Sequence, residues 1–305
     1  MHKVSFAGLI LILGAGLLFA QHERHSRSVT VTSDNDSAGD SCSDRMRTGF
    51  DFKSHVEDES TVALPNQPLQ IKAQQNGGIQ VTTWDQAGFS VKLCKQAASD
   101  SESRAREILN ETQISVKGSE VSVTGPKGGN DYSVATVLLV KAPKDAVVNL
   151  SAHNGGISLK GFTGTAEAET KNGGISLHHS SGKLTVKAEN GGISIGDCSG
   201  EVSVTVQNGG LSVALPERWE GKGLEAHLEN GGLNISVPKN FSAGLEVSGS
   251  NYVHFACKAS ACDGAEQIAE GGRRVLRIGG ANPQIRATTG NGGVTIHERD
   301  DQGSI

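Results

Sequence analysis

Three consecutive stretches of 18 residues decide the fold: NGGISLKGFTGTAEAETK (154–171), NGGISLHHSSGKLTVKAE (172–189) and NGGISIGDCSGEVSVTVQ (190–207). Asn-Gly-Gly also occurs outside these stretches, and the intervals that follow residue 154 are 18, 18, 18 and 22 residues. Such a fixed period is typical of repeat architectures. The seven copies begin at Asn76, Asn154, Asn172, Asn190, Asn208, Asn230 and Asn291.

Each repeat carries two alternating stretches. The third and fifth residues after every Asn are apolar and the residue between them is polar, which is typical of a strand with one buried face. A second alternating stretch precedes each regular copy, as Val202, Val204 and Val206 precede Asn208. Glycines at 164, 182 and 200 separate the two stretches. Each unit is therefore expected to form strand, turn, strand, turn.

Two all-β architectures fit this pattern. The first is a β-solenoid, similar to a parallel β-helix, made of 18-residue coils with Asn-Gly-Gly corners. The second is an antiparallel meander in which Asn-Gly forms type I′ hairpins. We favour the solenoid, because similar copies then stack about 4.8 Å apart and each coil closes its own core. The Asn side chains would form an amide ladder, and the glycines would supply the positive φ of a sharp bend.

The rest of the chain divides around these repeats. Residues 1–20 combine Lys3 with an uncharged stretch and predict a signal peptide, either cleaved or kept as an uncleaved anchor. Residues 21–60 are polar and are expected to form a flexible leader. The β-solenoid domain is expected over 61–297, with an N-terminal part (61–145), regular repeats (146–250) and C-terminal coils with a Cys loop (251–297). One short helix is expected near 100–110, capped by Ser99 or Asp100, and the tail 298–305 is expected to fray.

Five cysteines follow the N-terminal stretch. Export would place them in an oxidising compartment, where disulfides form. Cys257 and Cys262 are close enough in sequence to close a small loop, and Cys42 is a candidate partner for Cys94. This leaves Cys198 unpaired, at a repeat position where we expect a packed side chain rather than a nucleophile.

The sequence offers little for catalysis or for binding metals or nucleic acids. The net charge is −5 without a basic run, so nucleic acid is not an expected partner. His178 and His179 are adjacent on a strand and should point to opposite faces. Glu167 and Glu169 share a strand face, as a pair of catalytic carboxylates would. Stacking would set lysines beside such glutamates, which is the pattern of a solvated face. No catalytic residue, cofactor or metal ligand is expected.

The motifs together resemble a known family. The run of residues 137–150 leads into the repeats, and Asn76-Gly-Gly-Ile-Gln-Val-Thr-Thr-Trp84 and the helix near Ala105–Leu109 precede them in the same order. This arrangement resembles the bacterial putative-adhesin family, a cell-envelope domain of β-strand repeats whose function is largely unassigned. The resemblance covers about residues 60–297. It implies an exported β-solenoid with no catalytic residues to carry over.

Three hypotheses of function follow. The first is a non-enzymatic cell-envelope or secreted protein that acts in adhesion or scaffolding and binds an envelope, glycan or protein ligand. It would be periplasmic, cell-surface or secreted, and would touch a membrane only through an N-terminal anchor. The second is a β-helix polysaccharide lyase or hydrolase, although Phe162 and Trp219 are the only aromatic residues between 154 and 235. The third is a self-assembling structural element that forms homo-oligomers.

Overall fold

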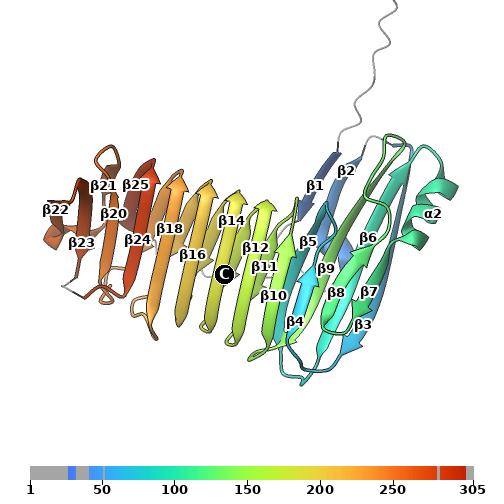
Figure 1. The fold of residues 1–305 in the computed structure, drawn as a ribbon, viewed down its shortest axis with the longest axis horizontal. Coiled ribbons are helices and arrows are strands. Elements are labelled where there is room, and N and C mark those ends of the chain that lie inside the picture. The colour runs from blue at the N-terminus through green and yellow to red at the C-terminus, as the bar shows by residue number, and fades with distance from the viewer. Residues whose placement is uncertain (1–26, 32–40, 51, 280–281, 300–305) are drawn as a thin grey trace, which may run out of the picture.

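The computed structural model describes residues 27–31, 41–50, 52–279 and 282–299. The described chain is all-β, with two long and mostly parallel sheets packed face to face (Figure 1). In spatial order, the 12-stranded sheet consists of β22 (Glu266–Glu270), β23 (Arg273–Ile278), β20 (Leu245–Ser250), β24 (Ile285–Asn291), β18 (Gly223–Asn230), β16 (Glu201–Asn208), β14 (Lys183–Asn190), β12 (Thr165–Asn172), β10 (Val147–Ala152), β4 (Leu69–Lys72), β8 (Glu120–Thr124) and β7 (Gln113–Lys117).

The second sheet has 11 strands. In spatial order it consists of β21 (His254–Cys257), β25 (Gly293–Glu298), β19 (Leu233–Val237), β17 (Leu211–Ala214), β15 (Ile193–Gly196), β13 (Ile175–His178), β11 (Ile157–Lys160), β5 (Gly77–Trp84), β9 (Tyr132–Pro143), β6 (Phe89–Ser99) and β3 (Ser54–Leu64). A two-stranded sheet joins β1 (Arg27–Val31) to β2 (Met46–Phe50).

Each regular repeat gives one strand to each long sheet. Equivalent strands pair in parallel at an offset of 18 residues, so that Ile157 lies opposite Ile175 and Val186 opposite Val204. The parallel pairing contradicts an antiparallel meander over these repeats. Every position that the alternation assigns to the inside of the regular repeats is buried, and together these side chains form one continuous core. The assigned facing of the strands is thus confirmed.

The C-terminal strands do not stack in sequence order. β24 lies between β18 and β20, and β25 lies between β19 and β21. The chain therefore leaves one place in the stack open after β19, continues into β20 and β21, and returns to fill it (Figure 1). The segment expected to be a Cys loop also carries structure. A short 3₁₀ helix η1 (Ser260–Gly264) is followed by the antiparallel hairpin β22–β23, which extends the 12-stranded sheet.

Antiparallel strands and a helix form the N-terminal end. β3, β6 and β9 pair antiparallel, and β7 forms a hairpin with β8. Helix α2 (Glu102–Glu111) begins after Ser101, rather than at the expected caps Ser99 or Asp100, and Ser101 makes no side-chain capping bond. Its buried residues Ala105, Ile108 and Leu109 pack with Ala97 of β6 and Val134 of β9. Lys95 binds the C-terminal end of the helix, because its Nζ donates to Leu109 O (2.8 Å) and to Thr112 O (3.0 Å).

Both expected disulfides are present, Cys42–Cys94 and Cys257–Cys262. The first ties the short helix α1 (Cys42–Arg45) to β6, where Met46 packs with Ala135 and Val137 on the outside of the 11-stranded sheet. The leader expected over 21–60 thus contains β1, α1, β2 and the first part of β3. The frayed tail expected from residue 298 is wrong for Glu298, which ends β25, and for Arg299, which is bonded to the fold. The segment 1–20 lies outside the described residues.

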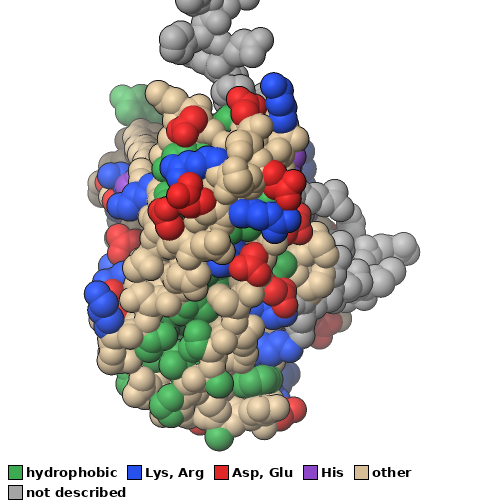
Figure 2. Space-filling view, turned by 90° about the vertical axis from the view of Figure 1, so that its right-hand side faces the viewer, with side chains coloured by type: hydrophobic (Ala, Val, Ile, Leu, Met, Phe, Trp, Pro, Cys, Tyr) green, Lys and Arg blue, Asp and Glu red, His purple; other side chains and the backbone are tan. Residues whose placement is uncertain are grey.

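Viewed from the N-terminal end, acidic and basic side chains are interspersed over the upper half of the surface, and hydrophobic side chains gather lower down (Figure 2). On α2 the ion pairs Arg104–Glu107 and Arg106–Glu102 contribute to this mixed charge. Neither sign of charge dominates the end. This surface therefore offers no basic patch of the kind that binds a phosphate backbone.

Candidate functional site: a glycine-lined groove

The seven Asn residues of the repeats form a single ladder at one corner of the stack. Six of the seven side chains donate from Nδ2 to Oδ1 of the Asn on the neighbouring coil, over distances of 2.9–3.2 Å, and Asn76 ends the ladder by donating to Lys127 O instead. The ladder includes Asn291, whose partner Asn230 is 61 residues away in sequence. The ladder therefore continues through the coil of β24 and β25, which stacks directly on the coil of β18 and β19. Its side chains are exposed, and they align the corners of the seven coils that carry Asn-Gly-Gly.

The first glycine of each motif is required by packing. A Cβ at Gly155, Gly173 or Gly191 would collide with the carbonyl group of the glycine one coil earlier. The expected positive φ is found at Gly209, Gly231 and Gly292 but not at Gly155, Gly173 or Gly191. Close backbone approach, rather than a left-handed bend, thus explains the first glycine in the regular coils.

The second glycine is under no such constraint. A Cβ at Gly156, Gly174, Gly192 or Gly210 would lie 3.2–3.7 Å from the nearest atom, a carbonyl oxygen of the next coil, and one at Gly232 would meet nothing within 4 Å. None of these five glycines has a φ in the left-handed region. The stack could therefore accept a side chain at this position with little or no movement, although every repeat has glycine there.

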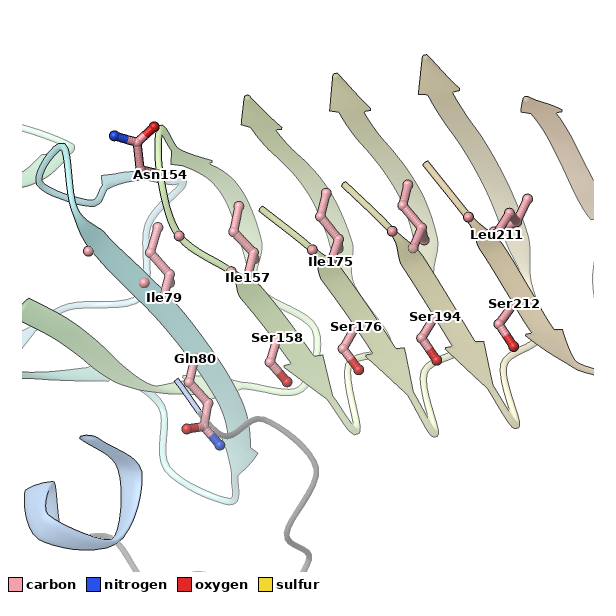
Figure 3. A pocket seen from close by; sticks show the side chains of 18 of the residues that line it. Ile79, Gln80, Asn154, Ile157, Ser158, Ile175, Ser176, Ser194, Leu211 and Ser212 are labelled. Carbon is pink, nitrogen blue, oxygen red and sulfur yellow. The ribbon is translucent and has the colours of Figure 1, made fainter. Parts of the chain in front are cut away.

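A groove of about 620 Å³ runs over these second glycines on the outside of the 11-stranded sheet. It crosses the starts of β5, β11, β13, β15, β17 and β19, so it lies along the stack and across the strands. With strands about 4.8 Å apart, six strands give a length of roughly 24 Å. Figure 3 shows a row of hydroxyls projecting from one side of the strands, with Gln80 at its end. The row consists of Ser158, Ser176, Ser194 and Ser212.

Two polar side chains in the groove are buried without a hydrogen-bond partner. Gln80 is 7% exposed and Ser176 is 8% exposed. Gln80 Oε1 and Ser176 Oγ both belong to the few buried side-chain oxygens in the described part of the chain that have no partner. Buried polar atoms are nearly always satisfied, so each exception needs an explanation. The remaining lining consists of Asn, Ile, Leu and further Gly and Ser residues.

Sequence reasoning missed this groove, although its signals were present. The alternation identified position 80 and its equivalents as polar and outward-facing, without showing that Gln80, Ser158 and Ser176 are buried. The repeated Asn-Gly-Gly was interpreted as a corner in which both glycines serve the bend. The different steric surroundings of the two glycines depend on the distance between neighbouring coils, which the sequence does not display.

The glutamates considered as a catalytic pair lie on the outside of the 12-stranded sheet. Glu169 lies opposite Lys187 in the register, and Lys187 forms its ion pair diagonally with Glu167, at 3.8 Å. Lys183 pairs with Glu201 at 3.4 Å. A hydrogen bond from Lys222 is the main cause that lowers the pKa of Glu201 below its ordinary range. These groups form the mixed-charge solvent face that the repeat pattern predicts.

The coils have a second corner, which follows β11, β13 and β15. Gly161, His179 and Asp197 occupy equivalent places in three coils, and all have positive φ (73°, 49° and 50°). The rings of His178 and His179 lie 6.4 Å apart. Among the described residues, no group of three or more His, Cys, Asp or Glu side chains has a geometry that could hold a metal ion.

Cys198 follows this corner and is buried at 1% exposure. Burial raises the pKa of its thiol to about 11, so the side chain stays protonated at neutral pH. This agrees with a packed residue rather than a nucleophile, because the thiolate is the reactive form.

The two disulfides are a feature that is typical of proteins in oxidising compartments. Within the described ranges, no helix has the length and apolar character needed to cross a membrane. The signal peptide or anchor expected over 1–20 falls outside those ranges and stays a prediction.

No family model and no curated protein matches the chain significantly. Solved structures similar to it include a putative cell adhesion protein from Clostridium sporogenes (14% identity, TM-score 0.31, covering 81% of this chain and 100% of that one). A putative adhesin from Bacteroides fragilis follows (12%, TM-score 0.29, 79% and 97%). A putative lipid binding protein from Parabacteroides distasonis is also similar (12%, TM-score 0.31, 79% and 96%).

Proposed function

We propose that the chain is an exported, non-enzymatic adhesion module built as a β-solenoid, and that the groove over the second glycines is its binding surface. The observation that carries this proposal is the continuity of the groove across six strands, each of which offers an equivalent small and uncharged surface. Such a surface suits a partner that is itself extended. Export is supported by the two disulfides and by the uncharged stretch of residues 4–20.

The chemistry of the groove favours binding over catalysis. Its serine hydroxyls would need a neighbouring base to become nucleophiles, and the residues that line it include no His, Asp, Glu, Lys or Cys. A polysaccharide lyase or hydrolase is accordingly the weaker hypothesis. End-to-end self-assembly is also weaker, because antiparallel strands terminate both sheets at the N-terminal end and the 12-stranded sheet at the other end, as capping units do in repeat proteins. Only the 11-stranded sheet ends in a parallel strand there, the four-residue β21.

Binding of the purified chain to immobilised envelope polymers and extracellular-matrix proteins tests this function. The informative variant is Gly210→Leu, which places a side chain in the groove at a position where a Cβ makes only an ordinary contact. The matched control is Gly264→Leu, at an exposed glycine of η1 with open space around it. Specific binding that Gly210→Leu abolishes and Gly264→Leu retains supports an adhesion module. Catalytic turnover of a bound polymer would overturn it.

A further inference from the structure

The five unconstrained glycines of the groove lie one residue before their strands, and each costs stability because glycine loses the most backbone freedom on folding. Neither φ nor steric crowding demands them. Their common effect is to leave the backbone bare over the length of the groove. Glycine is favoured where the backbone must approach a ligand closely. The groove is therefore shaped to hold an extended ligand against the backbone along its length.

The two unpartnered oxygens specify what such a ligand must offer. Gln80 Oε1 can only accept a hydrogen bond, and Ser176 Oγ can accept or donate one. Leaving a buried polar atom unpaired costs free energy that a bound donor would recover. A purely apolar ligand, such as an acyl chain, would leave both buried oxygens unpaired. The ligand therefore carries hydrogen-bond donors along its length.

The lining also restricts the charge of the ligand. All the residues that form the groove are Gly, Ser, Asn, Gln, Ile or Leu, so neither a cation nor an anion would find an opposite charge there. A charged chain would lose hydration without compensation. An acidic polysaccharide and a charged peptide are both disfavoured, which leaves neutral chains rich in hydroxyl or amide groups.

The spacing of the coils distinguishes between the two remaining classes of ligand, neutral peptides and neutral polysaccharides. Equivalent oxygens recur along the groove once per coil, about 4.8 Å apart. An extended peptide advances about 3.3 Å per residue, so its donors on one side recur at twice that distance and fall out of step with the coils. A pyranose unit with its glycosidic oxygen is close in length to one coil spacing. We propose that the groove binds a neutral linear polysaccharide along the stack, with sugar hydroxyls donating to Gln80 and Ser176.

This proposal rests on the proposed function of the groove and adds the chemical class of the ligand. The groove has no aromatic platform among its lining residues, so each sugar is held by hydrogen bonds and by contact with bare backbone. Each unit therefore contributes little, and affinity must accumulate over neighbouring units. Binding is expected to strengthen with chain length until the oligosaccharide spans the roughly 24 Å groove, and then to level off.

The test is calorimetric titration of the full chain with neutral oligosaccharides from dimer to hexamer. The probes are β-1,4-linked glucose, β-1,4-linked N-acetylglucosamine and α-1,4-linked glucose, with polygalacturonate as an acidic comparison. Ser176→Ala and Gln80→Met remove the unpartnered oxygens. Ser203→Ala is the matched control, because Ser203 is exposed on the opposite sheet. Thermal unfolding of every variant is measured in parallel.

We expect at least one neutral series to bind with length-dependent affinity, and Ser176→Ala and Gln80→Met each to weaken it about tenfold. Ser176→Ala should leave the unfolding temperature unchanged or raised, because it removes an unsatisfied buried oxygen. Ser203→Ala should change neither quantity. Preference for polygalacturonate, or neutral binding that both groove variants leave intact, overturns the proposal.

The same set of measurements separates this inference from the proposed function. If a protein or an acidic polymer binds and Gly210→Leu abolishes that binding, the groove is an adhesion surface and the polysaccharide class is wrong. If no probe binds in a manner sensitive to Gly210→Leu, both the ligand class and the groove as binding surface are wrong.

Discussion

Arg299 and Asp197 form a two-fold hydrogen-bonded ion pair across 102 residues of sequence, with one of the two bonds at 2.9 Å. Arg299 directly follows β25, and Asp197 lies at the corner after β15. The pair therefore fastens the last described residue to a coil in the middle of the stack. Arg299 also donates to Leu215 O at 3.3 Å, so its guanidinium spans two coils.

The first prediction concerns the pH dependence of this pair. The hydrogen bond from Arg299 is the main cause that lowers the pKa of Asp197. A carboxyl group with a lower pKa in the folded state contributes stability above its unfolded pKa, and this stability is lost as pH falls through the folded pKa. Both side chains are partly exposed (26% and 32%), so Asp197→Asn should cost about 1 kcal/mol at pH 7.

Denaturant unfolding from pH 7 down to pH 2 checks this. The free energies of unfolding of the parent and of Asp197→Asn should converge as the acid range is reached. A difference that stays constant over the whole range would show that Asp197 acts through packing instead of charge.

The second prediction compares adjacent positions of β16. Val204 is 1% exposed within the core, and Thr205 faces outward with intermediate exposure. Val204→Asp should cost roughly 3 kcal/mol or more, because it buries a charge without a partner, whereas Thr205→Asp should be nearly silent. Thermal or urea unfolding measures both. Equal effects would contradict the assigned facing of the strand.

The third prediction compares the two glycines of one corner. Gly191→Ala places a Cβ on the carbonyl oxygen of Gly173, and the backbone must shift to accept it. We expect a loss of about 1–3 kcal/mol, as for other overpacking changes. Gly192→Ala makes only a 3.4 Å contact with Gly210 O and should remain within about 0.5 kcal/mol of the parent. Losses of similar size at both sites would mean that the stability of the fold also requires glycine at the second position.

The fourth prediction concerns the unpaired thiol of Cys198. Because burial raises its pKa to about 11, iodoacetamide should modify it far more slowly in the folded chain than in urea at pH 8. Mass spectrometry of the unreduced protein should find one modified cysteine after unfolding, since the other four form disulfides. Rapid modification of the folded chain would show that this coil opens.

The fifth prediction concerns the attachment of α2. Lys95 is 2% exposed at its side chain and holds two carbonyl oxygens at the helix end, with Asp58 at 3.0 Å. Lys95→Met keeps the length of the side chain but leaves Leu109 O and Thr112 O without this donor. We expect a loss of roughly 2 kcal/mol, measured by denaturant unfolding. Lys92→Met on the same strand, where the lysine is partly exposed, is the control and should have a smaller effect.

The sequence predicts the regular part of this fold well, for a simple reason. Strand facing follows from the two-residue period of positions such as Val202, Val204 and Val206, and parallel register follows from identical residues 18 positions apart. Neither inference requires knowledge of distant contacts. The disulfides were likewise predictable, since Cys257 and Cys262 are neighbours in sequence and Cys42 and Cys94 completed the pairing.

The candidate site and the ends were less predictable because they depend on contacts between distant segments. Nothing in the local pattern distinguishes Asn291 from the other six copies, so the place of β24 in the stack was hidden. The burial of Ser176 compared with the exposed Ser194 depends on the surroundings of each coil and not on its own residues. Arg299 looked like part of a charged tail because its partner lies in another repeat.

The position of β24 and β25 has a consequence for how the chain is made. Synthesis delivers the N-terminal coils first, and these can stack as they emerge, because each contacts mainly its neighbours. The coil of β20 and β21 emerges before the strands that separate it from β18 and β19. One position in the stack must therefore stay empty until the final strands arrive, and folding is complete only when residues 285–298 have been synthesised. A chain that ends before β24 therefore has an open gap in the stack, although all six strands of the groove are present.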